Sequence, residues 1–341
     1  MNRRLFLMSV AGASLGCTTG RRRRLNVYNW ENYIASSTIP DFESEFNCQV
    51  RYATYGSAEE MLAKVMPGNS GWDVVFPSNS FVQPMRDLDL LARLDHNRLT
   101  NLQNLDQRFQ SPQWDPSLAW CVPYMHSATG IVYSKSVSRP PLAWADLWTD
   151  SYQRRVTMLD DPAEVFGACL KRMGCSINSG DERELKAARD LAIKQKPLLR
   201  AYLSEEVRDQ VVAGDVLVAQ MWAQVAQVAM DNSAKLAFSF PTEGFALYAD
   251  SACLLRESKH QDLGYEFINY LLRPNVAAAI ATEMRTATAN GAARALLSAS
   301  QRENTVLYPP ADVLQRGEWF KTLSGPVQRL RDRYWTEIKS A

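Results

Sequence analysis

The side chains that most often carry catalysis or bind metals are present in this sequence but form no recognised motif. The three histidines, His96, His126 and His260, lie far apart, and no two cysteines have the spacing of a zinc or redox site. The one Gly-x-Ser-x-Gly match begins at Gly12, inside an N-terminal segment that has the layout of an export signal. Acidic pairs such as Asp160-Asp161 do not by themselves make an acid–base site. The sequence therefore predicts no enzyme, no metal site and no cofactor.

The distribution of charge is compatible with a cationic ligand and argues against a nucleic-acid binder. The 341 residues include 38 basic and 37 acidic ones, and six of the arginines lie within the first 24 residues. Without those six, 32 basic residues face 37 acidic ones, so the remaining chain carries a net charge of about −5. A nucleic-acid binder needs a basic face, which this balance does not favour.

Short apolar runs alternate with helical patterns along the chain, which predicts two α/β lobes. Strands are expected at 25–30, 49–54, 72–77, 129–133, 155–159, 216–221 and 236–240, and helices near 40–46, after the capping box 57–60, and at 182–196, 204–213, 263–272 and 275–284. In such folds ligands bind where strands end at their carboxyl termini. This directs attention to Trp30, residues 77–80, Asp160-Asp161 and Trp222.

Residues 1–24 have the layout of an export signal, with a charged start, a short apolar middle and small residues before a cut. The pair Arg3-Arg4 resembles a twin-arginine signal, and residues 14–17 resemble a bacterial lipobox that would place a lipid on Cys17. The alternative is a signal that is cut off to leave a periplasmic product without an anchor. No later segment approaches 18 consecutive apolar residues.

The other five cysteines have irregular spacing, which is not typical of a disulfide framework. They are Cys48, Cys121, Cys169, Cys175 and Cys253. Buried free thiols are the favoured interpretation. A single bridge between the nearest pair, Cys169 and Cys175, is the alternative.

Five segments in a fixed order resemble the spermidine/putrescine-binding proteins of bacterial ABC importers. They are Tyr28–Tyr33 (YNWENY), Trp72–Ser78 (WDVVFPS), Trp144–Trp148 (WADLW), Asp160–Phe166 (DDPAEVF) and Gly317–Trp319 (GEW). The resemblance runs from about Leu25 to near the C-terminus.

This resemblance implies a type II periplasmic binding protein fold. Each of its two lobes would be a mixed, mostly parallel sheet flanked by helices, with the ligand cleft between the lobes and closure by a hinge motion. The first lobe would comprise 25–125 plus 250–294, and the second 126–249 plus 295–341. The implied product is a periplasmic monomer, in one version anchored through a lipid on Cys17, that gives its ligand to a membrane permease.

The family's ligand positions fall on residues whose chemistry suits a polyamine. A polyamine needs carboxylates at its ammonium groups and aromatic faces along its methylenes. The positions implied by the resemblance are Trp30, Glu31, Tyr33, Ser78, Ser80, Asp161, Glu164, Trp222, Tyr248 and Asp250. Tyr248 and Asp250, two apart on a strand, would point the same way, and Asp250 is expected to be the principal ammonium partner.

Several positions depart from the family's pattern. The chain has Trp30-Glu31-Asn32-Tyr33 where the family commonly has Trp-Thr-Glu-Tyr, so the acid has moved by one residue. Ser80 and Thr286 stand where the family often has tyrosine, and Phe320 where it often has glutamine. These changes affect the expected length and identity of the ligand more than its cationic character.

Other interpretations remain open from the sequence. Asp161 and Glu164 taken alone are typical of a helix start, and Trp30 and Trp222 taken alone are typical of a core. The same fold could bind another cationic or a zwitterionic metabolite, for which Arg285 is a candidate partner of the acid group. A sensory lipoprotein and an extracytoplasmic enzyme are the further alternatives.

Overall fold

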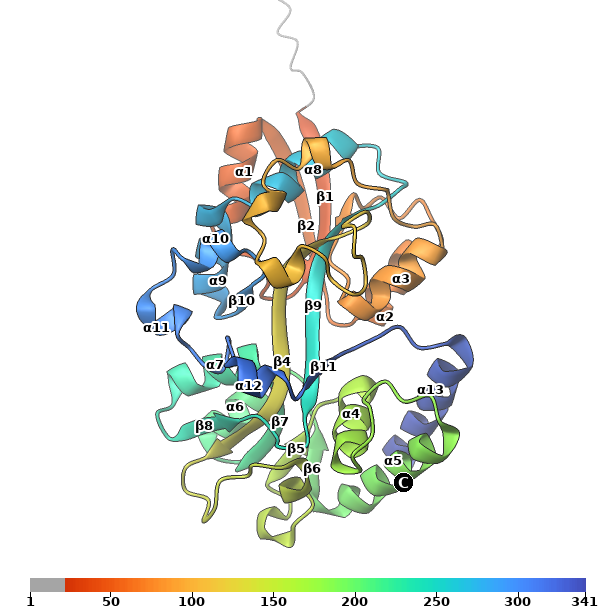
Figure 1. Ribbon diagram of the computed structural model, residues 1–341, viewed down its shortest axis with the longest axis vertical. Helices are drawn as coiled ribbons and strands as arrows, with labels where there is room; N and C mark the ends of the chain where they lie inside the picture. Colours follow the sequence, from red (N-terminus) through yellow and green to blue (C-terminus); the bar gives the residue numbers. More distant parts are fainter. Residues whose placement is uncertain (1–21) are drawn as a thin grey trace, which may run out of the picture.

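Two long antiparallel strands, β4 (Val122–Ser134) and β9 (Phe245–Leu254), run through the centre of the molecule and join its two lobes (Figure 1). The computed structural model describes residues 22–341, so the predicted signal sequence and Cys17 lie outside the described residues. Within 22–341, no helix has the length and apolar character needed to cross a membrane.

The first lobe contains a sheet in the order β2-β1-β3-β9. Its strands are β1 (Arg23–Trp30), β2 (Cys48–Tyr55) and β3 (Val74–Val75), with β1 parallel to β2 and to β3, and β3 antiparallel to β9. Its helices are α1 (Thr38–Phe46), α2 (Ala58–Val65), α3 (Asn79–Asp87), α8 (Gln261–Leu271) and α9 (Pro274–Met284). The hydroxyl of Ser57 caps α2 by accepting from the backbone N–H of Glu60, as its capping-box sequence predicts.

The second lobe continues the sheet in the order β4-β7-β5-β6. Its strands are β5 (Val156–Met158), β6 (Leu199–Tyr202), β7 (Val218–Trp222) and β8 (Leu236–Ser239), and β8 pairs with β4. Its longer helices are α4 (Pro162–Arg172), α5 (Glu182–Gln195), α6 (Val207–Ala213), α7 (Ala223–Asn232) and α13 (Gly325–Ser340). Helices flank the sheet on both sides in each lobe (Figure 1).

Shorter elements complete the chain. They are β10 (Ala287–Thr288), which pairs with β4, β11 (Gly317–Trp319), which pairs with β9, and the helices α10 (Gly291–Arg294), α11 (Ala299–Arg302) and α12 (Ala311–Leu314). Short 3-10 helices lie at His96–Arg98, Leu102–Asn104, Gln107–Phe109, Trp144–Leu147, Asp150–Tyr152 and Lys196–Leu198.

The buried apolar side chains form separate clusters in the two lobes. One large cluster contains Phe42 and Phe267, and the other contains Trp144 and Phe166. Trp319 of β11 packs against both clusters. Two cores of this kind support the expected division at 125/126, 249/250 and 294/295, which stays a prediction.

The expected α/β architecture with a mixed sheet is confirmed. The expected strands and helices are present with altered bounds, whereas β6, α3, α7 and α13 have no counterpart among the elements expected from the sequence. The strand expected at 129–133 is part of the 13-residue β4, because the pairing with β9 extends it back to Val122. The strand expected at 72–77 pairs as a ladder only at Val74–Val75. The five described cysteines are free thiols, so the Cys169–Cys175 bridge is absent and the favoured interpretation agrees with the structure.

Candidate functional site

Asp250 lies on the central strand β9 and is almost completely buried. Its side chain is 2% exposed, and the hydroxyl of Tyr33 donates a hydrogen bond to Oδ2 at 3.0 Å. Ser78, at the start of α3, forms an antiparallel bridge with Asp250. The strand ends of the first lobe therefore bring three of the predicted site residues together.

Glu164 is the corresponding buried acid of the second lobe. It is 3% exposed, and its Oε1 accepts hydrogen bonds from Thr129 Oγ1 at 2.7 Å and from Trp222 Nε1 at 3.0 Å. Thr129 and Trp222 are cross-strand partners on β4 and β7. Trp222 thus holds the carboxylate in place as well as presenting a half-buried ring.

Asp161 caps the helix that carries Glu164. Its Oδ1 accepts a hydrogen bond from the backbone N–H of Glu164 at 3.1 Å, and Pro162 occupies the first position of α4. Asp161 is therefore a helix-capping acid, as its position before α4 suggested, and it uses one of its two oxygens for the cap. The cap also fixes this carboxyl group beside the buried one of Glu164.

Tyr248 connects the acids of the two lobes. It lies two residues before Asp250 on β9 and opposite Ser127 on β4. Burial raises the pKa of the Tyr248 hydroxyl, and the charges of Asp250 and Glu164 raise it further. Both carboxylates are therefore close to one phenol ring, although they come from different lobes.

Trp30 lies beside Tyr33 and near Asp250. Its indole Nε1 donates to the carbonyl of Phe76 at 2.8 Å, and its ring lies 6.3 Å from the ring of Tyr33, centroid to centroid. Tyr33 is fixed in turn, because Tyr124 donates to its carbonyl oxygen at 2.6 Å. The aromatic residues are thus held by main-chain hydrogen bonds next to the buried acid.

Asp161, Glu164 and Asp250, which we call the carboxylate triad, have no cationic partner within residues 22–341. Among residues 22–341, no lysine, arginine or histidine forms an ion pair with any of the three. Burial raises the pKa of Asp250 to about 7, against the opposing effect of its hydrogen bond from Tyr33. Burial also raises the pKa of Glu164, helped by the charge of Asp161, and burial is the largest cause of the raised pKa of Asp161. Such groups favour a bound cation.

The remaining predicted residues lie at the edge of this arrangement. Glu31 is exposed, and the main-chain oxygen of Ser80 accepts a hydrogen bond from Thr322 Oγ1 at 2.7 Å. No hydrogen bond joins the side chain of either residue to the triad among the described residues. Both residues come from the first lobe, next to Trp30 and Ser78.

Glu205 is an acid near the site that the sequence reasoning missed. It follows β6 and is exposed at the surface. Desolvation raises its pKa most, the nearby Arg208 lowers it, and the charge of Glu31 from the other lobe raises it. Its charge in turn contributes to the raised pKa values of Tyr33 and Tyr248, for both of which burial is the largest cause. Strand order gives the signal that could have found it, because the carboxyl end of β6 lies beside that of β5, after which Asp161 follows.

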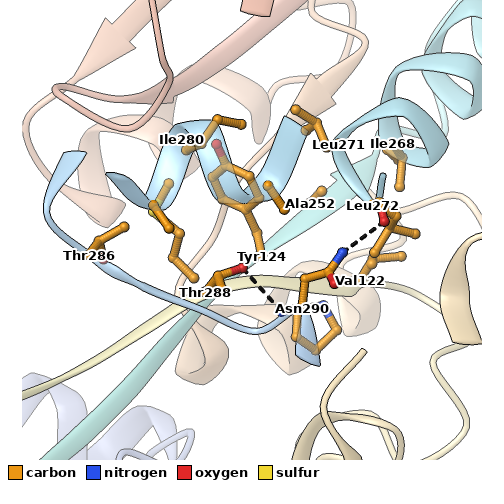
Figure 2. Close-up of a pocket in the computed structure, with 14 residues that line it drawn as sticks. Val122, Tyr124, Ala252, Ile268, Leu271, Leu272, Ile280, Thr286, Thr288 and Asn290 are labelled. Atoms are coloured by element: carbon orange, nitrogen blue, oxygen red, sulfur yellow. Dashed lines mark hydrogen bonds between the residues drawn. The ribbon is translucent and has the colours of Figure 1, made fainter. Parts of the chain in front are cut away.

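Two pockets elsewhere in the molecule contain none of the predicted ligand residues. Figure 2 shows a cavity of about 20 Å³ in the first lobe, where Asn290 Nδ2 donates to the carbonyl of Leu272 at 2.7 Å. A volume of that size holds a single water molecule. A groove of about 500 Å³ contains Arg285 and Thr286.

Arg285 does not face the carboxylate triad. Its Nε donates to Asp231 Oδ2 at 2.8 Å and its Nη1 to the carbonyl of Thr282 at 2.6 Å. The guanidinium is therefore already paired within the groove. This arrangement gives little support to Arg285 as the partner of a zwitterion's acid group.

Comparisons with known proteins match the chain along most of its length. The family model described as bacterial extracellular solute-binding protein matches residues 38–304. The putrescine-binding periplasmic protein PotF of Escherichia coli is 33% identical, with 100% of this chain and 99% of that protein covered. The putrescine/cadaverine-binding protein of Pseudomonas aeruginosa is 30% identical, with 99% of each covered.

Solved structures show the same fold. The spermidine/putrescine ABC transporter substrate-binding protein PotD from Streptococcus pneumoniae superposes with a TM-score of 0.83 at 28% identity, covering 93% of this chain and 99% of that one. The Tp0655 lipoprotein of Treponema pallidum superposes with a TM-score of 0.82 at 29% identity, covering 92% and 99%.

Asp250→Asn is expected to stabilise the unliganded protein at alkaline pH. The pKa of Asp250 rises from 3.8 to about 7 on folding. Between those values the folded state keeps a proton that the unfolded state has lost, so the free energy of unfolding falls as the pH rises. Asparagine can still accept from Tyr33 and does not titrate. We expect urea denaturation to show a gain on the order of 4 kcal/mol at about pH 8, shrinking toward about pH 4.

Asp160→Asn is the matched control for this experiment. Asp160 is 42% exposed in its side chain and pairs with Lys339 at 2.6 Å. Its replacement is expected to change the free energy of unfolding by less than about 1 kcal/mol at either pH. A variant Asp250→Asn that is less stable than the wild type at about pH 8 would contradict the assignment of an uncompensated buried acid.

Proposed function

Because the chain belongs to the bacterial extracellular solute-binding proteins, we propose that it captures a small polyamine outside the cytoplasm and delivers it to the membrane permease of an ABC importer. The family is one of binding proteins, so the expectation that the chain is not an enzyme is confirmed. The ligand class is that of putrescine and spermidine, which appear in the names of the relatives.

The observation that carries this proposal is the carboxylate triad without a cation. A carboxylate that leaves water without a positive partner is costly, and an ammonium group of the ligand removes that cost. Asp250 and Glu164 come from different lobes, and Tyr248 lies close to both. An elongated amine with a positive charge at each end therefore suits this arrangement, with Asp250 as the principal partner.

The aromatic side chains suit the carbon chain between the charges. Trp30 and Trp222 are half-buried, as is Tyr248, so each ring keeps a face that a ligand can cover. Burying the four methylenes of a butane stem contributes roughly 3 kcal/mol. The rings also favour a cation placed over their faces.

The proposed ligand-binding residues are those expected from the resemblance, with one addition. They are Trp30, Glu31, Tyr33, Ser78, Ser80, Asp161, Glu164, Trp222, Tyr248 and Asp250, with Glu205, whose pKa the charge of Glu31 helps to raise, as a further acid. The triad supplies the charge, the rings supply the apolar walls, and Ser78 supplies a hydrogen-bonding group.

Two of the departures from the family's pattern, at Ser80 and Phe320, lie close together, whereas Thr286 lies in the separate groove with Arg285. Asn79, between Ser78 and Ser80, donates to the carbonyl of Phe320 at 2.6 Å, so two of the altered positions lie near each other. The proposal therefore specifies a cationic amine and not its length.

Export and anchoring are part of the proposal. We propose that residues 1–24 direct the chain to the periplasm and that Cys17 carries a lipid, with the body acting as a monomer. The Treponema pallidum relative is named a lipoprotein, which supports the anchored form. A sensory lipoprotein is the alternative, and neighbouring genes for a permease and an ATPase would distinguish the importer from it.

Calorimetric titration with putrescine, spermidine, agmatine and a neutral diol of similar length tests the ligand class. The amines are expected to bind and the diol is not, because only the amines supply positive charge to the triad. Asp250→Asn is expected to weaken amine binding by at least about tenfold, which corresponds to 1.4 kcal/mol. Asp160→Asn, whose carboxylate pairs with Lys339, is expected to keep wild-type affinity.

Unchanged affinity in Asp250→Asn would show that the principal ammonium partner is wrongly assigned. Binding of the neutral diol as tightly as of the amines would contradict the ligand class itself. Because the variant is expected to fold at least as stably as the wild type, a loss of binding does not reflect unfolding.

Polyamine binding is expected to release protons near neutral pH. The raised pKa values of the triad mean that the empty site holds protons, and a nearby ammonium lowers those pKa values again. Affinity is therefore expected to rise from about pH 6 to about pH 8. Titrations at one pH in buffers of different ionisation enthalpy measure the number of protons released, and heats that do not depend on the buffer would contradict the coupling.

A further inference from the structure

Two buried cysteines face each other where the central strands enter the first lobe. Val122 of β4 and Ala252 of β9 are opposite each other in antiparallel register. One residue further along, Cys121 and Cys253 are therefore opposite as well, on the other face of the strands. Both side chains are 0% exposed and belong to one apolar cluster.

The hydrogen bonding of β9 shows which kind of cross-strand pair this is. Cys253 is the partner of Val75 on β3, and the N–H groups of Ser251 and Leu255 on either side of it donate to β3 or its extension. The main-chain groups of Cys253 therefore point toward β3 and away from Cys121. The main-chain N–H of Cys121 likewise does not pair with β9, because it donates to Asp115 Oδ2 at 3.1 Å.

Cys121 and Cys253 thus form a non-hydrogen-bonded pair, the closer of the two kinds in an antiparallel ladder. The Cα atoms in such pairs lie about 4.5 Å apart. Disulfides bridge Cα separations of about 4.4 to 6.8 Å. The separation expected of such a pair therefore falls within the range that a disulfide spans.

We propose that Cys121 and Cys253 form a disulfide when the chain folds in an oxidising compartment. The oxidant is a disulfide, either of a small thiol or of an oxidoreductase. One cysteine thiolate attacks it, releases one thiol and forms a mixed disulfide, which the second cysteine resolves with release of the other thiol. Two thiols of the chain lose two electrons and two protons, and the oxidant's S–S bond is reduced to two thiols.

The reaction takes place before the core closes. Burial raises the pKa of Cys253, and the neighbouring Cys121 raises it further, so few thiolates are present in the folded protein. Once formed, the bond is shielded from reductants by the same burial. The thiols act as packing groups in a reducing cell and as a cross-link after export.

The cross-link would join β4 and β9 at their first-lobe end. It would place no covalent constraint on the parts of these strands that lie in the second lobe. The loop that it closes contains residues 122–252, and therefore most of the expected second lobe. Closing a long loop restricts the unfolded chain strongly, which stabilises the folded state. It does so without a constraint between the lobes, so hinge motion is preserved.

To test this proposal, the reduced protein is refolded in the presence of glutathione disulfide. It is then unfolded in denaturant, and its free thiols are labelled with N-ethylmaleimide. Peptide mapping is expected to find Cys121 and Cys253 unlabelled before reduction and labelled after it. Cys48, Cys169 and Cys175 are expected to be labelled in both cases, since Cys48 faces Arg23 across β1 and β2 and the other two are not strand partners. Labelling of both Cys121 and Cys253 before reduction would overturn the proposal.

Thermal unfolding gives a second measurement. The melting temperature of the oxidised wild type is expected to fall by several degrees when reductant is added. Cys121→Ala and Cys253→Ala are expected to show no such response, whereas Cys48→Ala responds like the wild type. An equal response in all four proteins would contradict the assignment. None of these outcomes depends on the ligand, so the test is independent of the proposed function.

Discussion

Two buried carboxylates, Glu164 and Asp250, and the partly buried Asp161 have no positively charged partner among residues 22–341, and this is the constraint on which the rest of this structure depends. Each costs free energy in the empty protein, because the surroundings favour the neutral form. The fold holds them through directed hydrogen bonds, from Tyr33 to Asp250 and from Trp222 to Glu164. These bonds orient the acids but do not neutralise them, so the site is stabilised most by a ligand that brings the missing charge.

The topology explains how acids from distant parts of the sequence meet. The crossing strands β4 and β9 belong to both lobes. Strand β9 carries Tyr248 and Asp250 to the region where β1 and β7 end. Since the two buried acids come from different lobes, a cation between them favours the arrangement in which the lobes are close. Ligand binding and lobe closure are therefore coupled through one set of charges.

The sequence predicted the elements well where the signal is local. The cap at Ser57 and the end of α6 at Gly214 follow from residue types a few positions apart. The full length of β4 did not follow, because it depends on pairing with β9 more than 100 residues away. The resemblance pointed to the residues of the triad, whose part in binding stays a proposal. Glu205 was missed, since its relation to these residues depends on strand order and on the facing lobe.

A crystal structure of the protein with putrescine tests the central claim most directly. The account predicts one ammonium nitrogen within hydrogen-bond distance of the Asp250 carboxylate, the other beside Asp161 and Glu164, and the carbon chain against the aromatic rings. A diamine bound in the groove at Arg285, or one whose nitrogens contact only water and main-chain oxygens, would contradict it.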